Sequence, residues 1–397
     1  MASPGRCELL QAQATPDTIV VGVPGQLDLA HAPVPETAGE RLVFGTLYEP
    51  LVRLDCDGRA IPALAARWTE DGPRRWQFTL RPDARFWDGT PVTSRDVVAA
   101  WTLAGGTVAF AESLSTPNPR TLTVLLARPD TAILRQLADP RLAVALPAAN
   151  GGPPQGTTPY RVTAWTDGEI DAAAADRPGS LLRFQLAGGA DPRDLLDAGA
   201  DLLLTGDPDA LKYAAGRDGY DVEPLPWAWT YVATGELFPL HVDSVPSWGL
   251  TDAVHGDVRV AQPPFWWAGA PRCPEWLQRP SYHPPSMART IVYQARDRMA
   301  RDVAARLAAL LAEDSTPSGL APLGIRGLDP DAWADALAQD RALAFVTTLP
   351  RRAYATCVDL PAGPIVPLLD ARRSLIARRG RAHVVVEWDG TPRLVPP

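Results

Sequence analysis

One stretch, residues 41–101, constrains the fold more than any other part of the chain, because its motifs follow one another in a dense and ordered way. Trp76, Phe78 and Leu80 alternate there with polar residues. A period of two in apolar side chains predicts a β-strand that buries one face and exposes the other. The stretch is therefore predicted to contribute a half-buried strand to a sheet.

The residues after this strand predict a turn and then a helix. Asp88-Gly89 is a turn pair, because glycine can adopt a positive φ and aspartate can hydrogen-bond its own backbone. Thr93 is a predicted helix N-cap. The acid three residues later, Asp96, would satisfy free amides at the helix start and interact favourably with the helix dipole.

The order of these motifs resembles solute-binding protein family 5, the extracellular receptors of peptide and nickel ABC importers. The resemblance rests on four motifs in a fixed order: Tyr-Glu-Pro-Leu-Val at 48–52, Asp-x-Asp-Gly at 55–58, Pro-Ala-Leu-Ala at 62–65, and Leu-Arg-Pro-Asp-Ala-x-Phe-x-Asp-Gly-Thr-Pro-Val-Thr at 80–93. In the family this block is scaffold that does not hold the solute, so it says little about the ligand.

The resemblance implies an α/β protein with a two-lobed, type II periplasmic-binding-protein-like fold and an extra sub-domain inserted in the first lobe. The parts are expected to be an N-terminal tail over 1–17, a main lobe over 18–46, 153–235 and 376–397, the inserted sub-domain over 47–152, and a shortened, Pro- and Trp-rich second lobe over 236–375. The element Gly-Thr-Thr-Pro-Tyr at 156–160 resembles the Gly-Thr-Gly-Pro-Tyr with which the chain of family members returns to the main lobe.

Composition excludes some partners. The chain has 397 residues and a formal net charge of −8, so no basic field favours nucleic acid. No segment is apolar enough to form a transmembrane helix, and the N-terminus lacks the apolar region of a signal peptide. Because family members are exported, we expect a periplasmic or extracellular protein, with or without a membrane tether, whose leader is not part of this chain. A cytoplasmic protein is the alternative.

The four cysteines, Cys7, Cys56, Cys273 and Cys357, lack the CxxC spacing typical of zinc sites. One disulfide is compatible with an exported protein. We expect Cys273 and Cys357 to form it, since both fall in the same predicted lobe; free buried thiols are the alternative.

Two segments suggest ligand contacts near the first lobe. The apolar run 18–23 predicts a buried strand. In the family the loop after it, here 28–36, approaches the cleft. Glu36 in this loop is a candidate partner for a cationic ligand group, and the alternative is a solvated loop acid.

Residues 220–234 predict the strand that crosses between the lobes. Trp227, Trp229 and Tyr231 alternate and so share one face. This face would form an aromatic wall for a ligand if it lies in the cleft, or part of the core if it points inward. Hinge residues are expected near 233–235 and 372–376.

The second lobe departs from the family between residues 238 and 289, where prolines interrupt the long helix that family members usually carry. Trp266 and Trp267 in this region either cover the lobe or face the solute. Helices are predicted over 297–313 and from 329 onward, with strands over 290–293, 343–349 and 365–369.

In peptide-binding relatives the strand matching 343–349 leads to an acid that meets the α-amino group of the peptide. This chain has Arg351 and Arg352 near that place. If Arg351 faces the cleft, it favours a carboxylate through bidentate hydrogen bonds. If it faces outward, it is surface charge.

Catalytic and metal-binding motifs are missing. The five histidines form no HExxH, and the chain has no GxSxG, P-loop or GxGxxG. We therefore expect no enzyme, no cofactor and no metal site. The expected function is that of a monomeric receptor that binds a peptide or another small organic solute by hinge closure and serves the membrane permease of an ABC importer. A sensing or interaction module with the same fold, which no longer feeds an importer, is the alternative.

Overall fold

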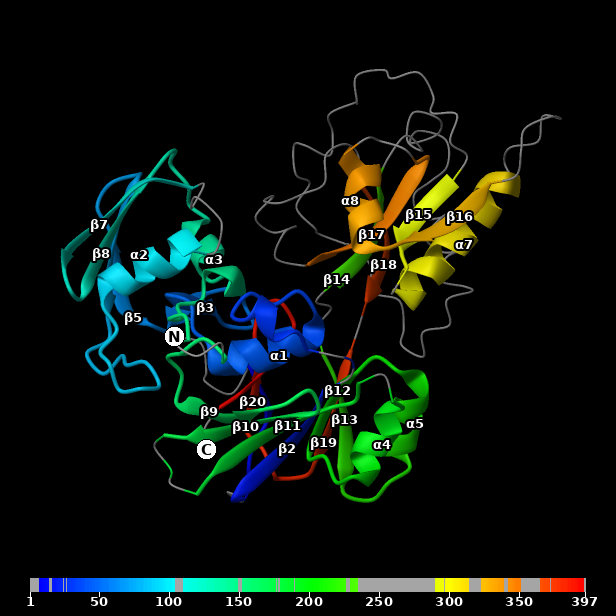
Figure 1. Ribbon diagram of the computed structural model, residues 1–397, viewed down its shortest axis with the longest axis horizontal. Coiled ribbons are helices and arrows are strands. Elements are labelled where there is room, and N and C mark those ends of the chain that lie inside the picture. Colours follow the sequence, from blue (N-terminus) through cyan, green and yellow to red (C-terminus); the bar gives the residue numbers. More distant parts are fainter. Residues whose placement is uncertain are drawn as a thin grey trace. The chain divides into compact units, whose positions relative to one another are not determined.

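The computed structural model divides into two compact units, Met1–Pro226 with Arg373–Pro397 and Trp227–Arg372, each of which is described by itself (Figure 1). The structure describes residues 7–13, 16–23, 25, 27–103, 110–148, 152–175, 177, 179–188, 190–225, 229–234, 290–295, 297–313, 323–338, 342–350, 365–371 and 373–395. The described residues form both helices and several sheets, so the predicted α/β class is confirmed.

A seven-stranded mixed sheet forms the centre of the first unit. Its strands lie in the order β13 (Tyr220–Pro224), β19 (Ser374–Arg378), β12 (Leu202–Thr205), β2 (Thr18–Val23), β11 (Leu181–Leu186), β10 (Glu169–Ala174) and β9 (Tyr160–Trp165). The central strand β2 pairs in parallel with β11 and β12, and the remaining neighbours pair antiparallel. Strands buried on both faces are continuous apolar runs, and β2 matches the strand predicted over 18–23.

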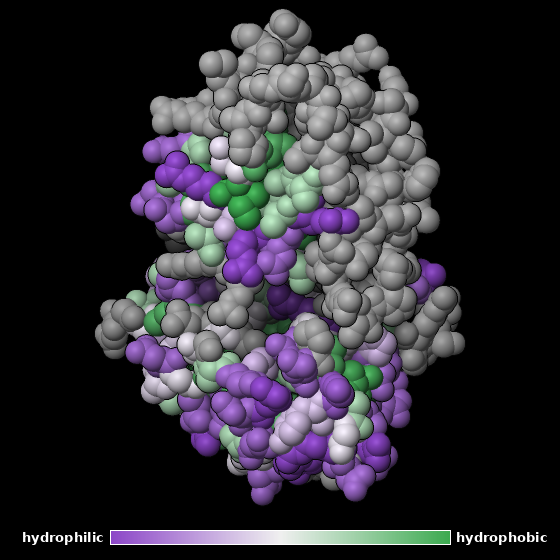
Figure 2. All heavy atoms as spheres, turned by 90° about the vertical axis from the view of Figure 1, so that its right-hand side faces the viewer, coloured by the Kyte–Doolittle hydropathy of each residue, from purple (hydrophilic) through white to green (hydrophobic). Residues whose placement is uncertain are grey.

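Helices cover both faces of this sheet (Figure 1). Helix α1 (Ala38–Leu47) packs its Leu42 and Phe44 into the core cluster on one face. Helices α4 (Pro192–Asp197) and α5 (Pro208–Ala215) cover the other face with Leu196 and Ala210. The outer side of α4 and α5 is mainly hydrophilic in Figure 2, because its exposed residues include Arg193, Asp194, Asp197, Asp209 and Lys212.

A sub-domain follows α1 in the chain. It contains the hairpin β3 (Val52–Leu54) and β4 (Ala60–Pro62), helices α2 (Ser94–Leu103) and α3 (Ile133–Leu137), and a four-stranded sheet in the order β5 (Ala65–Glu70), β6 (Arg75–Leu80), β8 (Thr121–Leu126) and β7 (Ala111–Asn118). Trp76, Phe78 and Leu80 are 8%, 0% and 1% exposed, which confirms the predicted alternation. Asp96 accepts hydrogen bonds from the backbone and hydroxyl of Thr93, both at 2.7 Å, as expected for the start of α2.

A three-stranded sheet brings the two ends of the described chain together. It has the order β1 (Glu8–Leu10), β20 (Val384–Val386) and β21 (Pro392–Leu394). Just before β1, Cys7 forms a disulfide with Cys56 of the β3–β4 turn. The predicted pair, Cys273 and Cys357, lies outside the described residues, and sequence spacing did not indicate the pair that the structure shows.

The second unit is built on a five-stranded sheet in the order β16 (Gly324–Leu328), β15 (Thr290–Gln294), β17 (Ala344–Pro350), β14 (Trp229–Thr234) and β18 (Ile365–Ala371). Helix α7 (Arg298–Glu313) packs Val303 and Leu307 onto this sheet. Helix α8 (Pro330–Ala338) packs Trp333 edge-on against Phe345, with ring centroids 5.6 Å apart. These helices and strands agree with the elements predicted between 290 and 369.

The predicted crossing strand over 220–234 is in fact two strands in two different sheets. β13 ends at Pro224 in the first unit, and β14 begins at Trp229 in the second. Proline cannot donate to a ladder, so a strand rarely continues through it. Ala233 and Thr234, which we expected near a hinge, instead pair with β17 and β18 within the sheet of the second unit.

Candidate functional site

Glu36 lies in the loop that joins β2 to α1, and its side chain is 65% exposed. This loop includes the short 3-10 helix Leu29–His31 and a cis peptide bond between Ala32 and Pro33. The Oε2 atom of Glu36 lies 3.4 Å from Nε2 of His31. The same nitrogen lies 3.8 Å from a carboxylate oxygen of Asp28, whose side chain is 60% exposed. Glu36 is thus accessible, as a ligand contact requires, but it already faces a histidine.

The loop is organised around Glu40 in the first turn of α1, whose side chain is only 1% exposed although it is an acid. Its carboxylate accepts hydrogen bonds from the backbone N–H groups of Asp28 at 3.1 Å, Glu36 at 2.8 Å and Thr37 at 2.9 Å. It also lies 2.8 Å from Nδ1 of His31. Thr37 completes a capping box by accepting from the N–H of Glu40. Both ends of the loop are therefore fastened to one buried carboxylate.

The charges of this cluster shift two pKa values in opposite directions. Burial alone would lower the pKa of His31, but the hydrogen bond to Glu40 and the negative charges of Glu40, Glu36 and Asp28 outweigh it, so the pKa is raised above 6.5. Burial alone would raise the pKa of Glu40, but the hydrogen bonds from His31 and from three backbone amides lower it below 4.5. The pair is thus stabilised as an ion pair.

Tyr231, a predicted ligand contact, lies in the core of the second unit and is 8% exposed. Its hydroxyl lies 3.1 Å from both carboxylate oxygens of Asp297. Asp297 also accepts from the N–H of Ala300 at 2.9 Å, at the start of α7. Tyr231 thus packs in the core of the second unit, where its hydroxyl links β14 to the start of α7. A contact of Tyr231 with a ligand stays a prediction.

The other candidate contacts have no described side chain. Trp229 contributes its backbone to β14, where it pairs with Pro350 and Ala371. The remaining candidates lie outside the described residues: Trp227, Trp266, Trp267 and Arg351. Their contact with a ligand remains a prediction.

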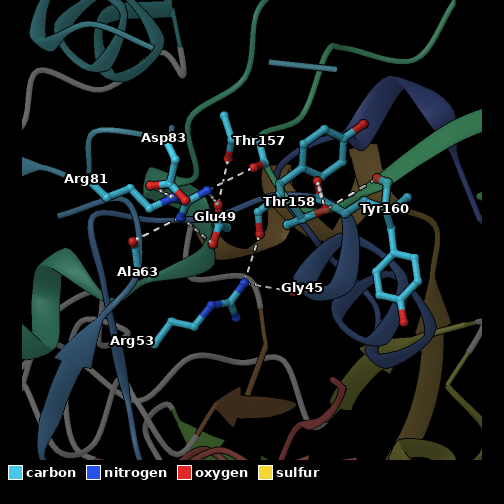
Figure 3. Close-up of polar contacts among 11 residues, drawn as sticks. Gly45, Glu49, Arg53, Ala63, Arg81, Asp83, Thr157, Thr158 and Tyr160 are labelled. Carbon is cyan, nitrogen blue, oxygen red and sulfur yellow. Dashed lines mark hydrogen bonds and ion pairs between the residues drawn. The ribbon is translucent and has the colours of Figure 1, made fainter. Parts of the chain in front are cut away.

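A polar network fastens the inserted sub-domain to the main part of the first unit (Figure 3). Arg81 donates to both carboxylate oxygens of Glu49, at 3.1 and 3.0 Å. The hydroxyl of Thr157 donates to the same carboxylate at 3.1 Å. Arg81 donates as well to the carbonyl oxygens of Ala63 and Thr157, at 3.1 and 3.2 Å. The side chains of Arg81 and Glu49 are 23% and 12% exposed, so the pair is largely shielded from water.

Thr158 stands where the family motif has a second glycine. The hydroxyl of Thr158 donates to the carbonyl oxygen of Leu47 at 3.1 Å. The side chain of Thr158 thus contacts the end of α1, a contact that glycine could not make.

Gly156, the first residue of the same motif, sits where no side chain fits. A Cβ atom there would lie 2.3 Å from the carbonyl oxygen of Leu47 and 2.5 Å from Cζ2 of Trp87. Trp87 in turn packs on Tyr48, with ring centroids 5.6 Å apart. The backbone N–H of Trp87 donates to the carbonyl oxygen of Gly156 at 3.1 Å. This glycine is therefore required by close packing.

The described residues contain no group of three or more His, Cys, Asp or Glu side chains that could hold a metal ion. One small cavity of about 20 Å³ lies beneath α1, lined among others by Pro33, Arg41, Arg53 and Asp389. Its volume is that of roughly one water molecule. In the part of the chain that is described, no helix combines the length and the apolar character needed to cross a bilayer.

Residues 59–174 match the family model described as bacterial extracellular solute-binding proteins, family 5 Middle. This part of the chain is similar to solute-binding protein family 5. The matched residues include the motifs at 62–65 and 80–93 and most of the inserted sub-domain, so the resemblance inferred from the sequence is confirmed.

Proteins similar to this chain bind different solutes. The periplasmic murein peptide-binding protein MppA of Escherichia coli K12 is 40% identical over 79 residues, which span 20% of this chain and only 14% of that relative. The structure of Staphylococcus aureus NikA in complex with Ni(L-His)2 has a TM-score of 0.67 at 11% identity and covers 95% of this chain and 98% of that chain. Haemophilus influenzae OppA in complex with RPPGFSPFR has a TM-score of 0.64 at 15% identity, covering 93% and 95%. These structures show the shared two-lobed fold.

Sequence reasoning missed the residues that hold the loop of Glu36. His31 and Glu40 were not among the candidate residues, although Thr37-x-x-Glu40 is a recognisable capping box. That signal predicts a helix start at this place. It does not show that the acid would also bond His31, which depends on the path of the loop between them.

Proposed function

We propose that this protein is an extracytoplasmic solute-binding receptor of an ABC importer, which binds a peptide or another small organic solute and delivers it to a membrane permease. The match of residues 59–174 to family 5 carries this proposal. The family consists of binding proteins, and the proposed role is accordingly to hold a solute without changing it chemically. One similar structure holds a peptide and another holds a nickel–histidine complex. The proposal therefore names small organic ligands in general and no single class of solute.

Binding by hinge closure is the second part of the proposal. The chain passes between the two units twice, after Leu225 and before Arg373. In the first unit, the N–H of Leu225 donates to the carbonyl oxygen of Arg373 at 3.0 Å. The two connecting segments therefore begin next to each other in this unit. Few residues would need to change φ and ψ for the units to close. A solute that binds the closed form better shifts the population towards it.

The disulfide supports a location outside the cytoplasm. Cys7 and Cys56 are bonded in the structure. Disulfides persist in oxidising compartments and are rare in the reducing cytosol. The periplasmic relatives agree with this location.

The proposal is tested by thermal melting of the purified protein with pools of short peptides and of other small organic solutes. A bound solute that does not bind the unfolded chain raises the melting temperature with its concentration. Small-angle scattering with and without an active solute then measures closure as a decrease in the radius of gyration. No shift with any pool would count against a solute-binding receptor.

Glu36→Gln then tests the loop contact, with Glu70→Gln as a matched control. Glu70 is likewise an exposed acid, but it lies on β5 of the inserted sub-domain. If Glu36 meets a cationic group of the solute, only the first substitution weakens binding. Equal affinities of both variants would remove Glu36 from the site.

The segment after β17 favours a second candidate function. Arg351 and Arg352 replace the acid of peptide-binding relatives, so a sensing or interaction module that no longer feeds an importer is the alternative. Deleting the gene would then leave uptake of the identified solute unchanged, whereas an importer receptor predicts loss of uptake.

A further inference from the structure

We propose that His31, in its protonated form, is a pH-responsive latch on the loop between β2 and α1, bridging Glu40 on one side and the exposed carboxylates of Glu36 and Asp28 on the other. The inference concerns the loop itself and goes beyond the proposed receptor function.

The geometry requires a hydrogen on both nitrogens of the imidazole ring. Nδ1 lies 2.8 Å from Oε1 of Glu40, and an ionised carboxylate can only accept, so Nδ1 must be the donor. A neutral imidazole has one N–H only. In that form Nε2 would present its lone pair to Glu36 at 3.4 Å and to Asp28 at 3.8 Å, which is repulsive. Protonated His31 instead attracts all three carboxylates.

The latch acts on the middle of the loop and leaves its ends in place. Glu40 holds the ends through the backbone amides of Asp28, Glu36 and Thr37. These bonds do not involve the imidazole ring. When His31 loses its proton, Glu40 is still fixed, whereas the side chains of Glu36 and Asp28, 65% and 60% exposed, can turn into water. The expected response is therefore local loosening.

The charges on neighbouring elements are already paired. Arg41 of α1 and Asp389 of the turn after β20 line the small cavity together with Pro33 of the same loop. Their side chains lie 3.7 Å apart. The charged groups that act on His31 are the carboxylates of Glu40, Glu36 and Asp28.

The two shifted pKa values define the pH window of the latch. The pKa of His31 is raised above 6.5, so its contribution is fully present below pH 6.5 and is lost as the pH rises through the folded-state pKa. The pKa of Glu40 is lowered below 4.5, so its contribution is present above pH 4.5 and is lost as the pH falls through its folded-state value. The latch is strongest between about pH 4.5 and 6.5. If the proposed receptor function holds, the position of Glu36 near the solute would depend on pH in the same way.

Hydrogen exchange of the intact chain tests the latch without a solute. After correction for the intrinsic effect of pH on exchange, the amides of residues 29–34 in the middle of the loop are expected to exchange roughly tenfold faster at pH 8.5 than at pH 6, the size of effect when a hydrogen bond to a charged group is lost. The amides of Asp28, Glu36 and Thr37, which donate to Glu40, should keep their protection. His31→Asn should show the fast exchange at both pH values. His383→Asn is the matched control, because His383 lies 3.1 Å from Glu8 and not in this loop.

Proton NMR of the histidine rings provides the second readout. The His31 signal, assigned by its loss in His31→Asn, should titrate above pH 6.5, and Glu36→Gln should lower its midpoint. Glu36→Gln changes a side chain that is 65% exposed and is not expected to impair folding. Titration of His31 below pH 6.5, or equal exchange of the loop in wild type and His31→Asn at both pH values, would overturn the proposal.

Discussion

Replacing Gly156 by alanine adds one methyl group at the point where the inserted sub-domain meets the main part of the first unit. Gly156 does not have a positive φ, so its backbone conformation suits alanine. The whole cost of Gly156→Ala is therefore steric. It arises because the new Cβ would lie 2.3 Å from the carbonyl oxygen of Leu47 and 2.5 Å from Cζ2 of Trp87.

The size of the effect follows from what would have to move. A carbon and a carbonyl oxygen normally approach no closer than about 3.3 Å, so a shift of about 1 Å is required. The oxygen of Leu47 ends α1 and accepts from Thr158, and the ring of Trp87 is stacked on Tyr48. Neither neighbour can yield freely. Overpacking of this kind costs about 1–3 kcal/mol, and we expect a value near the upper end, which lowers the melting temperature of a domain of this size by roughly 6–12 °C.

Gly45→Ala is the matched control for this substitution. Gly45 lies inside α1, and a Cβ atom there would meet nothing within 4 Å outside its own helix. Alanine in a helix interior is more favourable than glycine by about 1 kcal/mol. Urea unfolding followed by tryptophan fluorescence should therefore show opposite signs for the two variants. A Gly156→Ala protein as stable as wild type, within about 0.5 kcal/mol, would refute the packing argument.

Two further predictions concern the fastening of the first unit. The double variant Cys7→Ser/Cys56→Ser should lose about 4 kcal/mol in urea unfolding, since the bond closes a loop with a sequence separation of 49 residues; peptide mapping that finds Cys7 and Cys56 unlinked would contradict the structure. Glu49→Gln should cost about 2–3 kcal/mol, because Arg81 loses a charged partner in a largely shielded site. Its control Glu112→Gln breaks an exposed pair with Arg74 and should cost less than about 1 kcal/mol. Equal losses in the two variants would show that shielding is irrelevant here.

Elements with a strong local pattern could be predicted from the sequence. The alternation at 76–80 and the apolar run at 18–23 correspond to β6 and β2. A strand buried on one face alternates apolar and polar residues, and a strand buried on both faces is a continuous apolar run, so both can be recognised in a sequence. The sequence did not predict β19, although Ser374–Ala377 is fully buried. The apolar run after the two arginines is too short to show the alternation of apolar and polar residues that indicates a strand.

The contacts of the candidate site could be predicted less well, because they depend on tertiary pairing. Nothing in the spacing of the cysteines links Cys7 to Cys56, since their pairing depends on the tertiary approach of the segment before β1 to the β3–β4 turn. Tyr231 shows the same limit. The alternation of residues in a strand does not reveal that the hydroxyl of Tyr231 lies within hydrogen-bond distance of Asp297. Glu36 was proposed as a ligand contact only because the resemblance points to its loop.

The central claim is that the folded protein binds a small solute and later releases this solute to a permease. Native mass spectrometry of protein purified without refolding tests it most directly. The account predicts a mass above that of the polypeptide which disappears on denaturation, and a released peptide or small organic molecule that raises the melting temperature when added back. A bare polypeptide mass, together with no melting shift for any peptide or solute pool, would contradict it.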